Sequence, residues 1–162
     1  MFEPKAFGRP AFLALAALLA SPAAVSAARQ GEFDVTYSAD LVAEGEWLPI
    51  GPDLRQRMNV LELEATGAGG FLGTTSATCH YTQEEDARSG AYRNVGWCAW
   101  RGGDGDLLFE SWEGGATNGG ATLFGTGRLA GGTGKFAGAT GSLSFSYGES
   151  GRQRGYYELP SQ

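Results

Sequence analysis

The stretch from Gly125 to Gly141 reads Gly-Thr-Gly-Arg-Leu-Ala-Gly-Gly-Thr-Gly-Lys-Phe-Ala-Gly-Ala-Thr-Gly. Seven of its residues are glycine, namely Gly125, Gly127, Gly131, Gly132, Gly134, Gly138 and Gly141. Glycine adopts backbone angles closed to other residues and lets two chain segments approach closely. This spacing excludes a helix and predicts short strands joined by tight corners, as a small closed sheet requires. We therefore interpret these glycines as structural.

Strand-like segments occur along the whole chain and are separated by glycine, proline or polar turns. The expected strands span residues 33–41, 53–65, 71–83, 94–101, 106–112, 121–129, 143–147 and 156–159. A bulge near Val60 and Leu61 would account for the imperfect alternation of the second strand. Asp104-Gly105 lies between two strands and is a strong hairpin signal. No segment has the periodicity of an amphipathic helix.

Eight short strands without helices predict an all-β fold, which is either a sandwich or a closed barrel. Closure is favoured, because eight strands just close around a filled core or a small ligand cavity. The glycines between Gly125 and Gly141 suit the sharp coiling that closure demands. The sequence therefore predicts an eight-stranded antiparallel closed barrel.

The first 27 residues have the composition of a secretory signal peptide. Lys5 and Arg9 precede an apolar run at residues 11–20, and small residues follow up to the expected cleavage site after Ala27. A membrane anchor is the alternative, but ten apolar positions are fewer than the about 20 that span a bilayer. We therefore expect residues 1–27 to be a signal peptide and residues 28–162 to form one β-barrel domain, exported to the periplasm or secreted.

The mature chain of 135 residues carries 10 basic and 17 acidic residues, which gives a net charge near −7. Nucleic acids and anionic membrane surfaces are bound through clustered lysine and arginine. The acidic balance therefore argues against both as partners. We expect no membrane span in the mature protein.

The chain contains two cysteines, Cys79 and Cys98, which lie 19 positions apart. An isolated pair in an exported protein is more often bonded than free. The polar segment from Glu84 to Arg93 lies at their midpoint, so a hairpin about it places the two cysteines opposite each other. A zinc site is the alternative, but His80 is the single histidine, and three such residues fall short of the usual four ligands. We therefore expect a disulfide and no metal.

The run from Gly131 to Gly141 resembles the Gly-Gly-Thr-Gly-(Lys/Arg)-Phe signature of the allene oxide cyclase and dirigent barrel superfamily. The preceding order of Trp97-Cys98, the Gly-Asp-Gly-Asp turn at residues 103–106, and Trp112-Glu113-Gly114 is similar to small exported bacterial members with such a barrel. The resemblance covers roughly residues 97–147, and its most specific part is the glycine-rich corner.

This resemblance implies an eight-stranded antiparallel barrel, which agrees with the independent strand count. In the plant relatives the barrel holds a hydrophobic oxylipin or a phenoxy radical pair and steers its cyclisation or coupling mostly by shape. Related barrels often form dimers or trimers, so the resemblance allows a homo-oligomer, but the oligomeric state is not readable from the sequence. No catalytic residue is carried over, because the polar cavity residues of the cyclase have no match in this sequence. The signal peptide and the expected disulfide also depart from the plastid enzyme.

Aromatic residues give the best functional lead, because a small barrel lined by aromatic rings can hold an apolar ligand at its mouth. Five of them form the candidate ligand-binding set: Tyr81, Trp97, Trp100, Trp112 and Tyr147. The predicted function is binding of a small hydrophobic molecule in or at the mouth of the barrel, without a cofactor. The alternatives are a cyclase or isomerase acting by shape on such a ligand, and a secreted protein that contacts another protein through residues 44–52 and 84–93.

Histidine and aspartate patterns give weaker signals. We expect His80 on the polar outer face of its strand, and a serine triad cannot be built without a histidine base. Asp104 and Asp106 suggest a calcium loop, but the fifth and twelfth positions of such a loop are Leu108 and Gly115 here. We therefore interpret Asp104-Gly105 as a solvated turn.

Two further patterns suggest phosphate binding and acid–base chemistry. Gly134-Lys135 is followed by Phe136 rather than by the Ser or Thr of a phosphate-binding loop, so that function is rejected. Glu110 shares a strand face with Trp112, and two glutamates at positions 62 and 64 also share a face. Such carboxylates do acid–base work when one is buried with a raised pKa. Charges on a strand are more often solvated, so we expect these glutamates to be exposed.

Overall fold

The structure is a computed structural model and describes residues 28–66, 70–116 and 122–161. The expected signal peptide, residues 1–27, lies outside the described residues. Within the described ranges the chain forms nine strands and one three-residue 3-10 helix, η1. They are β1 (Arg29–Glu44), β2 (Leu48–Pro49), β3 (Leu54–Thr66), β4 (Thr74–Asp86), β5 (Tyr92–Gly102), β6 (Leu107–Ala116), β7 (Leu123–Gly132), η1 (Gly134–Phe136), β8 (Thr140–Tyr147) and β9 (Gly151–Leu159).

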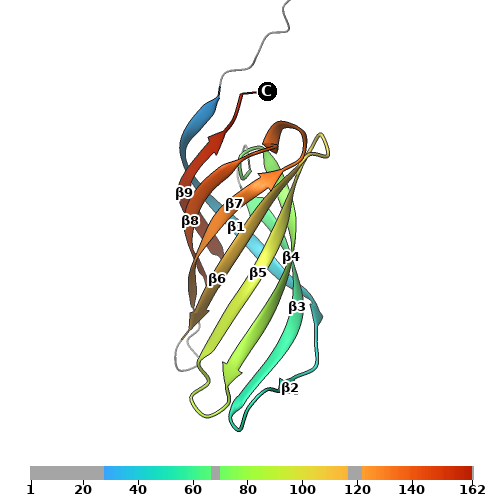
Figure 1. Ribbon diagram of the computed structural model, residues 1–162, viewed down its shortest axis with the longest axis vertical. Helices are drawn as coiled ribbons and strands as arrows, with labels where there is room; N and C mark the ends of the chain where they lie inside the picture. The colour runs from blue at the N-terminus through green and yellow to red at the C-terminus, as the bar shows by residue number, and fades with distance from the viewer. Residues whose placement is uncertain (1–27, 67–69, 117–121, 162) are drawn as a thin grey trace, which may run out of the picture.

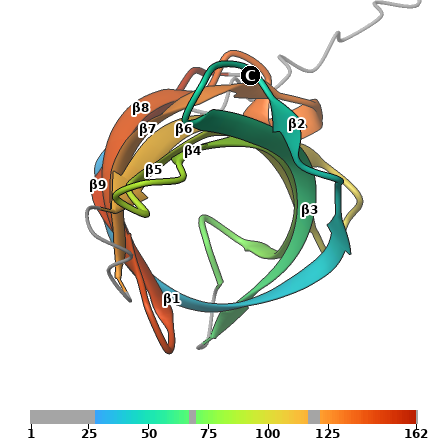
Figure 2. The ribbon, with the colours of Figure 1, turned by 90° about the horizontal axis from the view of Figure 1, so that it is seen from below.

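The strands form one antiparallel sheet that closes on itself (Figures 1 and 2). Strands β3 to β9 pair in sequence order, β9 pairs with β1, and β1 returns to pair with β3. The two-residue strand β2 lies outside this circuit and pairs only with the start of β3. The predicted all-β fold and eight-stranded closed barrel are thus confirmed, with one extra short strand. We call the end where β1 begins the upper end, and the end with the β4–β5 hairpin the lower end.

Several strand boundaries differ from those that the sequence pattern indicates. Strand β9 begins at Gly151 rather than near Tyr156, because its first half alternates between outward arginines and small or polar inward residues and so carries little apolar signal. Strand β4 begins at Thr74, three residues after the predicted start. The bulge predicted near Val60 and Leu61 does occur at that pair, but the extra residue is Val42 on the partner strand β1.

The disulfide lies within the β4–β5 hairpin, as predicted. Cys79 stands directly opposite Cys98 in the register of the two strands, and their Cα atoms are 4.0 Å apart. Both side chains are buried in the barrel interior. The cross-link therefore fixes the register of β4 against β5 in the middle of the barrel wall.

The glycine-rich corner joins β7 to β8 at the upper end and is anchored to the β5–β6 turn. Gly131, Gly134 and Gly138 have φ angles of 88°, 49° and 73°, a region that favours glycine. The exclusion of a helix was wrong for three residues, since the backbone of η1 turns tightly between these glycines. The Lys135 backbone N–H donates to the Asp106 carboxylate at 3.0 Å, so the two turns are held together.

Glycines inside the barrel stand beside large side chains. A Cβ atom on Gly125 would lie 2.3 Å from the Phe145 ring, and one on Gly151 would lie 2.1 Å from the Tyr37 ring. Such distances leave no room for any side chain. The inward-facing glycines therefore create the space that the aromatic rings fill, as small barrels require.

Replacement of Gly134 by valine should lower the stability of the protein strongly. The new side chain would impose a strained φ of 49° and displace the Asp106 carboxylate, 2.1 Å from the Cβ position. Gly103 is the matched control, because a Cβ there meets nothing within 4 Å. Urea unfolding should show Gly134→Val far less stable than Gly103→Val. Equal midpoints for the two variants would contradict the structural role of the corner.

Candidate functional site

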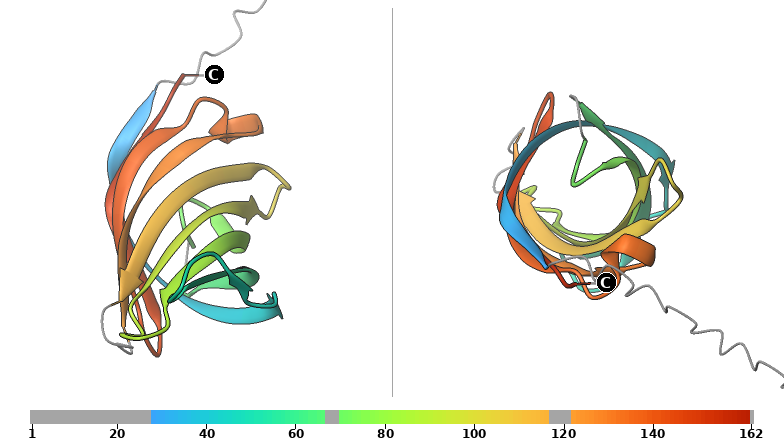
Figure 3. Two further views of the ribbon diagram at one scale, coloured as in Figure 1. Left: turned by 60° about the horizontal axis from the view of Figure 1, so that its bottom comes forward. Right: turned by 90° about the horizontal axis from the view of Figure 1, so that it is seen from above.

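The upper half of the barrel interior is packed with buried side chains. Residues 70–73, just before β4, place Phe71 inside the barrel, where its ring lies 4.8 Å from Phe33 and 4.9 Å from Trp100 between centroids. Phe71, Trp100, Leu108 and Phe136 have no exposed surface. The views along the barrel axis show the start of β4 and the segment before it inside the ring of strands (Figures 2 and 3). These side chains close the upper end.

A small cavity lies below this packed layer and has a volume of about 40 Å³. All eight barrel strands contribute to its lining, through Tyr37, Ala39, Leu61, Leu63, Cys79, Cys98, Glu110, Trp112, Leu123, Phe145, Tyr147 and Gln153. Most of these side chains are aliphatic or aromatic. Cavities that enclose a whole drug-sized ligand are about 300 Å³ or larger, so the interior of this barrel is largely filled.

One acidic side chain, Glu110, is buried in this cavity wall with only 1% of its surface exposed. The Trp100 indole Nε1–H donates to Glu110 Oε2 at 2.8 Å, and the Gln153 amide Nε2–H donates to Glu110 Oε1 at 3.0 Å. Burial raises the pKa of the Glu110 carboxyl to about 7, although both hydrogen bonds oppose this shift. The carboxyl is therefore poised to titrate near neutral pH.

The expectation that Glu110 is exposed was wrong. Its strand alternates so that Leu108, Glu110 and Trp112 share the inward face, and all three are buried. Two apolar neighbours at spacings of two residues were the signal that could have placed Glu110 inside. Gln153 was missed altogether, because its flanking arginines made the segment look solvated. By contrast, the glutamates at positions 62 and 64 are exposed, as predicted.

Two buried polar atoms of the cavity lining have no hydrogen-bond partner among the described residues. They are the Gln153 carbonyl oxygen, Oε1, and the Trp112 indole Nε1–H. Their residues are 3% and 9% exposed. A buried polar group without a partner costs about 1–3 kcal/mol of stability. The cavity wall is therefore largely apolar, and two of its residues each carry one buried polar atom without a partner among the described residues.

The structure brings four of the five predicted ligand-binding residues to the barrel interior. Trp112 and Tyr147 line the cavity, and the Tyr81 ring packs on Trp112 with 5.5 Å between centroids. Trp100 lies in the packed layer above and holds Glu110 rather than facing the cavity. Trp97 lies apart from this group, on the outer surface of the barrel, where 59% of it is exposed.

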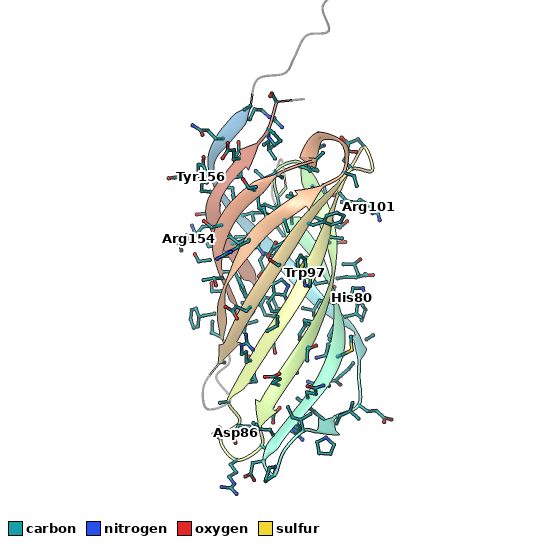
Figure 4. All side chains as sticks on the ribbon, in the orientation of Figure 1. His80, Asp86, Trp97, Arg101, Arg154 and Tyr156 are labelled. Atoms are coloured by element: carbon teal, nitrogen blue, oxygen red, sulfur yellow. A yellow bond between two sulfur atoms is a disulfide. The ribbon has the colours of Figure 1, made fainter. Side chains whose placement is uncertain are left out.

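Other candidate residues lie on the outer surface. His80 is exposed and stands directly opposite Trp97 in the β4–β5 register, as Figure 4 shows. Asp104 forms an ion pair with Lys135 at 2.6 Å, and this hydrogen bond lowers the pKa of the Asp104 carboxyl. Asp104 thus serves to hold two turns together. Among the described residues, no group of three or more His, Cys, Asp and Glu side chains is placed to hold a metal ion.

In residues 28–66, 70–116 and 122–161, no helix has the length and apolar character needed to cross a membrane.

The raised pKa of Glu110 makes stability depend on pH. The folded state holds this proton up to a pH of about 7, whereas an ordinary glutamate loses it near 4.5, so the folded state binds more protons between these values. The stabilisation is fully present below about pH 4.5 and is lost as pH rises to about 7. Wild-type protein should lose about 3 kcal/mol more unfolding free energy from pH 4.5 to 8 than Glu110→Gln.

Urea unfolding at pH 4.5 and pH 8 for both proteins measures this difference. The glutamine keeps an oxygen acceptor for Trp100 and carries no charge, which makes it the matched replacement. Equal pH dependence in the two proteins would mean that Glu110 titrates normally.

Comparison with known proteins does not extend this description: no protein-family model matches the chain, and a search of curated proteins finds no match either.

Proposed function

We propose that this protein is an exported barrel that binds one small hydrophobic molecule at its lower mouth, with a slim end of the molecule inserted into the interior cavity. The observation that carries the proposal is the cavity itself. It is the space that the packed side chains leave unfilled, and its lining is largely aliphatic and aromatic. Small-molecule sites are typically lined by such side chains but are much larger, so only the end of a ligand can enter this cavity.

The volume of the cavity determines how the ligand is held. About 40 Å³ accommodates the tip of a chain and no more, so most of the molecule lies nearer the lower mouth. Ala39, Leu61, Leu123 and Tyr147 are partly exposed members of the lining and offer apolar surface there. Leu41 stands directly opposite Leu61 on the same face and is 49% exposed, which extends this surface toward the rim.

We also propose that the barrel is of the allene oxide cyclase-like type and that the mature protein is exported. The closed eight-stranded antiparallel circuit and the glycine-rich corner between β7 and β8 support the barrel type. The disulfide between Cys79 and Cys98 supports export, because disulfides persist in oxidising compartments. A cofactor-independent isomerase acting on the same ligand is an extension of this proposal, since a carboxyl with a pKa of about 7 can donate or accept a proton at neutral pH.

A protein-interaction role is the second candidate, and one observation favours it. The segment between β1 and β3 is held against the barrel by Trp47, whose ring lies 4.3 Å from the guanidinium groups of both Arg55 and Arg57. This fixed segment and the adjoining start of β3 expose several apolar side chains, namely Leu48, Ile50, Leu54 and Met58. Such a preformed apolar surface suits contact with another protein.

Binding at the proposed site should quench the fluorescence of Trp112. 1-Bromohexane is a suitable probe, because its bromine quenches tryptophan only at contact. Wild-type protein and Trp97→Phe should both be quenched, whereas Trp112→Phe should lose the saturable part of the signal. The pair is matched, since Trp112 lines the cavity and Trp97 lies on the outer surface. Loss of the signal in Trp97→Phe alone would place the ligand outside the barrel.

Filling the cavity should weaken binding of the same probe. Ala39→Leu adds a branched aliphatic group at the cavity wall and should exclude about two CH₂ groups of the ligand tip. At about 0.8 kcal/mol for each buried CH₂, affinity should fall roughly tenfold. Ala99→Leu is the control, because Ala99 lies on the opposite face of β5 from the buried Cys98 and Trp100 and outside the cavity lining. If 1-bromohexane shows no saturable binding to any of these proteins, the ligand proposal fails and the protein-interaction role remains.

A further inference from the structure

We propose that the outer face of the barrel carries a second binding site, a trough between Trp97 and Arg128 that holds a sugar acid unit of an acidic glycan. This site goes beyond the proposed function, because it opens on the outer surface of the wall rather than on the interior. It is carried by one open hollow, to which β5, β6, β7 and β8 contribute. Trp97 and Arg128 both line this hollow and are exposed.

Three side chains of one cross-strand row form the trough. Trp97 stands directly opposite Ser111, and Ser111 stands directly opposite Arg128. Residues that stand opposite each other point to the same face of a sheet. Because neighbouring strands lie about 4.8 Å apart, the backbones of Trp97 and Arg128 are about 10 Å apart. The small serine between them therefore leaves an open space with an aromatic wall on one side and a cationic wall on the other.

The aromatic wall presents a tryptophan ring to solvent. Trp97 is 59% exposed, whereas its neighbours on the other face of β5, Cys98 and Trp100, are buried inside the barrel. Strand β5 crosses the front of the barrel in Figures 1 and 4, where Trp97 is labelled. A pyranose ring carries C–H groups on its faces and hydroxyl groups around its edge. Its C–H face can therefore pack on the electron-rich face of an indole while its hydroxyls stay in contact with water.

The cationic wall is an arginine whose charge is not neutralised by a neighbour. Arg128 makes no hydrogen bond or ion pair with any residue that the structure describes. Glu113 is the acidic residue that lines the hollow, and it is bound instead by Arg93 at 2.7 Å. A guanidinium group presents its N–H donors in a planar fork that matches the two oxygens of a carboxylate. Arg128 is therefore available to pair with a carboxylate on a ligand.

The charges of the outer surface are segregated in a way that favours an anionic ligand on this face. The outward positions 32–40 of β1 and 60–64 of β3 carry Glu32, Asp34, Asp40, Glu62 and Glu64, with no lysine or arginine among them. The outward arginines lie instead on β5, β7 and β9, namely Arg93, Arg101, Arg128, Arg152 and Arg154. Only two of them form ion pairs among the described residues, with Glu113 and Asp34. The acidic net charge of the chain thus conceals a locally basic face.

Hydroxyl side chains favour a sugar acid over other anions. Ser111, Thr126 and Ser142 line the hollow, and a hydroxyl both donates and accepts hydrogen bonds, as the hydroxyls of a sugar do. A free phosphate or sulfate would use Arg128 but not the ring of Trp97. An aromatic acid would use both walls but none of the three hydroxyls. A uronic acid uses all of these groups.

Biolayer interferometry of the mature protein on immobilised polygalacturonate, alginate and hyaluronan tests the inference, because these polymers carry different uronic acids. The esterified form of each polymer keeps the sugar rings and removes the charge, and single-stranded DNA carries charge without a sugar acid. At least one uronate polymer should bind about tenfold more tightly than its ester and than the DNA, as one charge-assisted pair provides. Binding to none of the three uronates, or equal binding to an ester or to the DNA, would overturn the inference.

Two variant pairs on the tightest-binding polymer test the residue assignment. Arg128→Gln should weaken binding about tenfold and remove the preference over the ester. Arg101→Gln is the matched control, because it removes the same charge from the same face outside the hollow. Trp97→Ala should weaken binding about tenfold, whereas Phe124→Ala removes a ring that is 63% exposed and also outside the hollow.

Equal losses within either pair would mean that the face attracts the polymer without a defined site, which would overturn the inference. All four side chains are exposed, so each variant should keep the fold. Quenching of Trp112 by 1-bromohexane reports on the interior and should be unchanged in Arg128→Gln. The outer site and the proposed function can therefore each fail without the other.

Discussion

The interior of the barrel depends on a close fit between glycine backbones and the large side chains of neighbouring strands. Gly151 lies against the Tyr37 ring, Gly125 against Phe145, and Gly96 against Trp112. Because a glycine has no side chain, the facing ring can pack directly against the backbone of the neighbouring strand. Closure of eight strands then leaves little free volume, and the remaining cavity of about 40 Å³ lies among these rings.

The buried carboxyl of Glu110 is the second organising feature. Its burial lowers stability, so its presence in the interior calls for another explanation. Burial of an acidic group is unfavourable, and a hydrophobic side chain of similar size would often stabilise a core more. Glu110 instead joins Trp100 to Gln153 across three strands and leaves the amide oxygen of Gln153 unpaired. Groups whose pKa is shifted by burial in a cavity are typical of functional sites. The proposed ligand site gives this costly arrangement a role that stability alone does not.

The sequence could predict the eight strands of the barrel, its closure, the disulfide and the glycine corner, because each depends on local patterns. The alternation of apolar and polar residues around Cys79 and Cys98 predicts that both side chains face the interior. The polar segment midway between the two cysteines predicts the hairpin. The candidate site was harder to predict, because it depends on which side chains of distant strands meet in the barrel interior. Glu110 and Gln153 are 43 positions apart and meet only through barrel closure. Trp97 was misplaced because both faces of β5 are apolar in sequence, while only one faces the interior.

The inward-folded segment that carries Phe71 gives the barrel a direction. With the upper end packed by Phe71, Trp100 and Phe136, the partly exposed side chains of the cavity lining, Leu123 and Tyr147 among them, lie toward the lower end. Under the proposed function, the end of a ligand therefore enters and leaves by one route, past Tyr147 and Leu123. Arrival and departure then share one kinetic barrier, set by the lower rim.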